Sequence, residues 1–78
     1  MSKIVRYTKA EALALSFEKL SKIISRNTKG EILIKLFLIN GYFDREQSIM
    51  KKPQLLSILL GSLVKLRDNN EDISKYIN

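Results

Sequence analysis

The sequence predicts an all-α protein: a small three-helix bundle with short flanking turns, occupying residues 1–78 as a single domain. Residues 8–11 and 28–31 both have the form of a capping box, Thr-x-x-Glu, in which the threonine and glutamate side chains satisfy free backbone N–H groups at a helix start. Apolar residues at helical spacing follow each box, and a third such series follows Pro53.

The first helix is expected over residues 9–26. Leu13, Phe17, Leu20 and Ile24 recur at spacings of four, three and four residues, so they share one face of a continuous helix. The second helix is expected over residues 29–40. It is apolar nearly all round and ends at a glycine, so it is expected to be central and covered by its neighbours.

The third helix is expected over residues 53–67, with Pro53 in its first turn and a stripe of leucines on one face. Gly61 weakens a helix interior, so a close crossing with another backbone is expected there. Residues 44–50 and 71–77 are expected to add short helical turns.

The chain begins with an alternating, strand-like segment, residues 3–7, with no second strand in the chain to pair with it. Two alternatives remain open: a disordered arm, or a strand that pairs with its own copy in a dimer.

Positive charge is concentrated at the N-terminal end. The net charge is +6, and residues 1–30 carry seven basic side chains against two acidic ones. Such asymmetry indicates a polyanionic partner, although a solvated lysine-rich surface would look the same.

Composition argues against catalysis. The chain has no cysteine and no histidine, which removes the commonest metal ligands and the commonest general base. The acidic residues in or beside loops form no recognisable constellation, and no glycine-rich phosphate loop is present. A non-enzymatic protein without cofactor or metal is expected. No signal-peptide core or bilayer-length apolar stretch occurs, which predicts a soluble, cytoplasmic protein.

The order of short basic strand, helix and capped helix over residues 3–43 resembles the ribbon-helix-helix family of dimeric DNA-binding proteins. The resemblance implies that paired strands enter the major groove of duplex DNA. Arg6 would read bases from the face it shares with Thr8, while Thr28 and Lys29 would hold a backbone phosphate.

A basic helix face is a second way to bind nucleic acid, because Lys19, Lys22, Arg26 and Lys29 follow one another at spacings of three, four and three. The preferred function is therefore a small, dimeric nucleic-acid-binding regulator. Its candidate contact residues are Lys3, Arg6, Thr8, Lys19, Lys22, Arg26, Thr28 and Lys29.

The alternative is a helical module that binds another protein. The order of helix, apolar helix, loop, proline and leucine-rich helix also resembles the bacteriocin immunity proteins, which are basic helix bundles. With either function, three helices cannot hide all of the apolar residues, Leu55 and Ile58 among them. An exposed patch of that kind predicts a homodimer or a stable protein partner.

Overall fold

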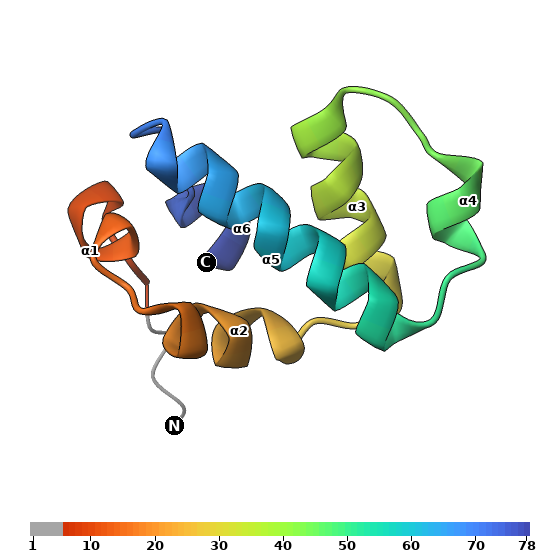
Figure 1. Ribbon diagram of the computed structural model, residues 1–78, viewed down its shortest axis with the longest axis horizontal. Helices are drawn as coiled ribbons and strands as arrows, with labels where there is room; N and C mark the ends of the chain where they lie inside the picture. Colours follow the sequence, from red (N-terminus) through yellow and green to blue (C-terminus); the bar gives the residue numbers. More distant parts are fainter. Residues whose placement is uncertain (1–5) are drawn as a thin grey trace.

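The computed structural model describes residues 6–78 and confirms the all-α prediction, since these residues form helices and no strand (Figure 1). In place of three helices with flanking turns, the described residues form a series of longer and shorter helical segments. They are α1 (Lys9–Leu13), α2 (Phe17–Ser25), α3 (Lys29–Asn40), α4 (Arg45–Ser48), α5 (Lys52–Asp68) and α6 (Ser74–Ile77).

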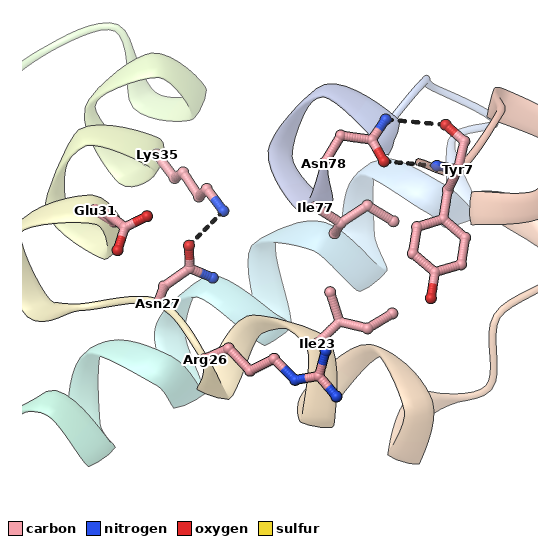
Figure 2. Close-up of a pocket in the computed structure, with 8 residues that line it drawn as sticks. All are labelled: Tyr7, Ile23, Arg26, Asn27, Glu31, Lys35, Ile77 and Asn78. Carbon is pink, nitrogen blue, oxygen red and sulfur yellow. Dashed lines mark hydrogen bonds between the residues drawn. The ribbon is translucent and has the colours of Figure 1, made fainter. Parts of the chain in front are cut away.

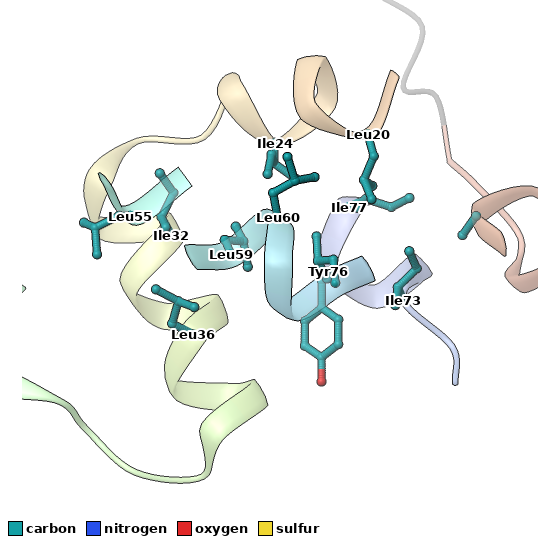
Figure 3. Packing of buried hydrophobic residues seen from close by; sticks show 12 residues of the cluster. Leu20, Ile24, Ile32, Leu36, Leu55, Leu59, Leu60, Ile73, Tyr76 and Ile77 are labelled. Atoms are coloured by element: carbon teal, nitrogen blue, oxygen red, sulfur yellow. The ribbon is translucent and has the colours of Figure 1, made fainter. Parts of the chain in front are cut away.

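Helix α5 lies at the centre of the fold, and both α2 and α3 pack against it (Figure 1). Figure 3 shows how side chains from these helices meet in one apolar core, which residues of the C-terminal segment complete. The largest fully buried side chains are Leu20, Ile24, Ile32, Leu36, Leu55, Leu59, Leu63 and Ile73. Ile73, Tyr76 and Ile77 of this C-terminal segment are all buried.

The prediction of one continuous helix over residues 9–26 is wrong. The first helix ends at Leu13, and α2 begins after Ser16, whose hydroxyl accepts a hydrogen bond from the Lys19 N–H. The carbonyl of Leu15, which lies in this break, accepts a hydrogen bond from the Arg67 guanidinium of α5. A side chain from across the fold therefore satisfies the backbone where the two helices separate, and Phe17 is 57% exposed rather than part of the core stripe.

Both capping boxes and the glycine C-cap are confirmed. Thr8 pairs with Glu11 at the start of α1 and Thr28 with Glu31 at the start of α3, while Gly41 ends α3 in the left-handed conformation with φ of 81°.

The expectation that the apolar helix α3 is covered by its neighbours is wrong, because only one side of it packs against α5. Ile32 and Leu36 are buried on that side, but Ile34 and Leu38 are exposed.

Helix α5 and the short turns agree with expectation to within a residue or two, since α5 spans Lys52–Asp68 and α4 and α6 fall inside the predicted segments. The close crossing expected at Gly61 is wrong. No atom of a neighbouring element lies within 4 Å of the position that a Cβ would occupy there. Leu55 is fully buried and Ile58 partly buried, so neither forms the exposed patch that was expected of them.

The predicted strand-like arm falls mostly outside the described residues, and so does Lys3. Of the predicted segment, the structure describes only Arg6 and Tyr7, and neither forms a strand. The backbone N–H of Tyr7 donates to Asn78 Oδ1 at 2.6 Å, and Asn78 Nδ2 donates to the Tyr7 carbonyl at 2.9 Å. The amide of Asn78 thus engages both main-chain polar groups of Tyr7. Within residues 6–78, no helix has the length and apolar character needed to cross a membrane.

Replacing Gly61 by alanine is expected to stabilise the protein by up to about 1 kcal/mol, because an exposed mid-helix position gains helix propensity without a steric clash. Gly41→Ala is the matched control. It should destabilise the protein by about 1–2 kcal/mol, since alanine is strained at positive φ. Urea unfolding followed by circular dichroism measures both changes, and a destabilising Gly61→Ala would contradict the absence of a close neighbour.

Candidate nucleic-acid interface

Three cations lie on the outer face of α2. Lys19, Lys22 and Arg26 are exposed and fall within about two turns of one another, roughly opposite the buried side chains of Leu20 and Ile24. Arg26 is the last of this series because it ends the helix as its C-cap. The predicted basic face of α2 is therefore open to a partner.

The next cation, Lys29, occupies the first position of α3 and is exposed. The preceding Thr28 serves as the N-cap: its hydroxyl accepts from the Glu31 N–H at 3.3 Å, and its own N–H donates to Glu31 Oε1 at 3.0 Å. Thr8 makes the same pair of hydrogen bonds with Glu11 at the start of α1. Both threonines are thus N-caps whose side chains stabilise a helix start.

The first turn of α5 lies beside the first turn of α3 (Figure 1). The hydrogen bonds from Thr28 are the main cause that lowers the pKa of Glu31, and the charges of Lys35 and Lys52 lower it further. Lys52 is therefore close enough to the start of α3 to act on the acidic residue in its first turn. Lys51 and Lys52, both exposed, extend the positive charge from Lys29 onto α5.

The start of α5 is electrostatically unusual. The N-terminus of a helix carries partial positive charge, which acidic side chains normally offset. The first turn of α5 contains no acidic residue, and Lys51 as its N-cap supplies no side-chain acceptor. The side chain of Gln54 accepts from the Lys51 N–H, so one backbone donor is satisfied. Two lysines at such a position are repelled by the helix end, and a bound anion would relieve that repulsion.

A hollow of about 580 Å³ opens between α2, α3 and the C-terminal segment (Figure 2). Lys35 reaches it from α3, and its ammonium donates to Asn27 Oδ1 at 2.7 Å. The buried amide of Asn27 in turn donates to the Ile24 carbonyl at 2.9 Å, which holds the lysine in place. Partial burial lowers the pKa of Lys35, an effect that the charge of Glu31 opposes.

Arg26 joins this hollow to the α2 face, because it lines the hollow and also belongs to the series of cations on α2. Tyr7 and Asn78, locked together by their two hydrogen bonds, line the opposite side (Figure 2). The Glu31 carboxylate also lines the hollow, and the amides of Asn27 and Asn78 already donate to backbone carbonyls. Of the lining groups, the cations are therefore the ones suited to phosphate oxygens. We call the whole set of cations the cationic surface; it comprises Lys19, Lys22, Arg26, Lys29, Lys35, Lys51 and Lys52.

The structure brings four of the predicted cations into this surface, and the candidate Thr28 directly precedes Lys29 as the N-cap of α3. Arg6 and Thr8 belong to the segment before α1, and Lys3 lies outside the described residues. The sequence-based prediction missed Lys35, Lys51 and Lys52. Lys51 and Lys52 could have been noticed in the sequence, because they directly precede Pro53 at a predicted helix start. Cations are disfavoured at a helix start, so a pair of them there indicates a role other than stabilising the helix.

No protein-family model, curated protein or solved structure gives a significant match to this chain. Within the described residues, no group of three or more acidic side chains is placed to hold a metal ion. The function therefore has to be inferred from the geometry and charge of the chain itself.

Glu31 gives a testable pH dependence. Its pKa is lowered in the folded protein by the hydrogen bonds from Thr28, so its ionised form stabilises the fold above its usual value of 4.5, and this contribution is lost as the pH falls. Glu31→Gln cannot ionise and should unfold with a shallower loss of stability on acidification. Urea unfolding at several pH values from about 6 downward measures the difference. Equal slopes in the two proteins would contradict the role of the capping carboxylate.

Proposed function

We propose that the protein is a small non-enzymatic nucleic-acid-binding regulator that holds the phosphate backbone of duplex DNA against the cationic surface. The observation that carries the proposal is the pair of lysines at the start of α5, Lys51 as its N-cap and Lys52 in its first turn, next to Lys29 at the start of α3 (Figure 1). Positive charges at a helix start are unfavourable; Glu31 offsets the charge of Lys52 in part, and a polyanion would make both positions favourable.

The distribution of charge supports a polyanion rather than a small anion. The cations are spread from the first half of α2 to the start of α5, and each is exposed except the partly buried Lys35. Between residues 16 and 31 the acidic side chains are Glu18 and Glu31, and Glu31 is engaged in capping α3. A row of exposed cations can pair with successive phosphates of a nucleic-acid strand, and the counterions bound to those phosphates are then released.

The cationic surface is suited to contact with the backbone rather than to reading of bases. Six of the seven cations are lysines, whose ammonium groups are flexible point charges. Bases are usually recognised by arginine, whose planar guanidinium donates two hydrogen bonds to guanine, and the surface has only one arginine. This mode of binding does not require an N-terminal ribbon, and both main-chain polar groups of Tyr7 are already hydrogen-bonded to Asn78.

Binding of this kind should weaken steeply with salt. A fluorescently labelled duplex is titrated with the protein between about 50 and 200 mM salt, and the logarithm of the affinity is plotted against that of the salt concentration. The variant Lys51→Gln/Lys52→Gln should bind more weakly. Its slope should be smaller by about 2, because each phosphate that is no longer neutralised lowers the slope by about 0.9.

The matched control is Lys65→Gln/Lys75→Gln, which removes the same charge from the far end of α5 and from α6. It should leave the slope close to that of the unchanged protein. Absence of binding at low salt would overturn the proposal. Equal effects of the two double variants would also overturn it, because the response would then reflect net charge instead of this surface.

A further inference from the structure

Among the described residues, every exposed large apolar side chain except Phe17 lies on α3 or in the segment between α3 and α5. Ile34 is 62% exposed, Leu38 60% and Ile49 83%, and the aromatic rings of this segment are open to solvent as well. The complete set, which we call the α3 surface, is Ile34, Phe37, Leu38, Tyr42, Phe43 and Ile49. A monomeric protein seldom leaves so many large apolar side chains together in water.

The outward side of α3 has a regular pattern. Ile34, Phe37 and Leu38 lie at the helical spacing that forms one stripe, on the side away from the buried Ile32 and Leu36. Exposed glycines, at positions 30 and 41, lie at the two ends of the same stripe. The middle of the stripe is thus apolar, and the residues at its two ends have no side chain, which favours the close approach of another helix.

A small hollow lies within this stripe. It measures about 160 Å³ and is lined by Leu33, Ile34, Phe37 and Phe43. A cavity of about 150 Å³ lined by such residues accepts a benzene ring, so this hollow has room for one leucine or phenylalanine side chain. Leu38, one turn along the helix from Ile34, is exposed beside it. The α3 surface therefore carries both an apolar hole and an apolar knob.

We propose that the α3 surface binds a second copy of this chain, with the two α3 helices antiparallel about a two-fold axis. Under this pairing, Leu38 of each protomer enters the hollow of the other, as a knob enters a hole in helix pairs. Ile34 then faces Phe37 across the axis, and the glycine at the start of one helix faces the glycine at the end of the other.

Self-complementarity favours a second copy over an unrelated protein. A two-fold interface requires one patch that fits itself, and a knob beside its own hole on one straight stripe satisfies this requirement. The area is of the right order. With about 150–250 Å² for a large side chain, the six residues expose on the order of 600 Å², about three quarters of the roughly 800 Å² that each partner buries in a standard interface.

Dimerisation through the α3 surface does not depend on nucleic-acid binding, and the mass in solution tests it. Light scattering after size-exclusion chromatography should give a dimer for the unchanged protein. Leu38→Asp should give a monomer, because it would bury an unpaired charge in the apolar hollow. Phe17→Asp is the matched control. It removes a similarly exposed apolar side chain from α2, away from the α3 surface, and should remain a dimer.

The register has its own test. Ile34→Lys and Phe37→Glu should each give monomers, and an equimolar mixture should give a heterodimer, because the introduced lysine faces the introduced glutamate across the axis. Circular dichroism verifies that every variant is folded, and Leu38→Ala replaces Leu38→Asp if the latter is not. A monomeric unchanged protein, a dimer that survives the removal of the Leu38 side chain, or a mixture that stays monomeric would each overturn the proposal.

Discussion

The fold depends on the burial of one face of α5. Leu55, Leu59 and Leu63 are fully buried on this helix, and α2 and α3 each find their main packing partner there. Deleting one such leucine side chain typically costs about 2–5 kcal/mol, which is comparable to the total stability of a small domain. Because the cationic surface includes parts of α2, α3 and α5, it exists only when these three helices are packed.

The sequence predicted the helix starts and ends that depend only on residues close by in the chain. The boxes at Thr8 and Thr28 and the glycine at position 41 act within a few residues, and each was predictable. The break between α1 and α2 was not, because it involves Arg67, 52 residues from the Leu15 carbonyl that it satisfies. The apolar spacing across the break is the same as that of a continuous helix, so periodicity alone could not reveal it.

The candidate site was predictable only in part for a similar reason. The spacing of Lys19, Lys22 and Arg26 shows that they share a helix face, but nothing in the sequence places the start of α5 beside the start of α3. The apolar pattern of α3 was also ambiguous. Apolar side chains in a core and in an interface have the same chemistry. Ile32 is buried and Ile34 is exposed only because Ile32 is on the side of α3 that packs against α5.

The cationic surface and the α3 surface meet at α3, and this constrains how the two proposals combine. The cations lie at the N-terminal end of α3, whereas the apolar stripe runs along its outward side. In an antiparallel pair the two N-terminal ends point in opposite directions. A helix of 12 residues is about 18 Å long, so the two copies of Lys29 would lie at least roughly that far apart. A dimer of this kind would hold two separate stretches of phosphate backbone rather than one extended stretch.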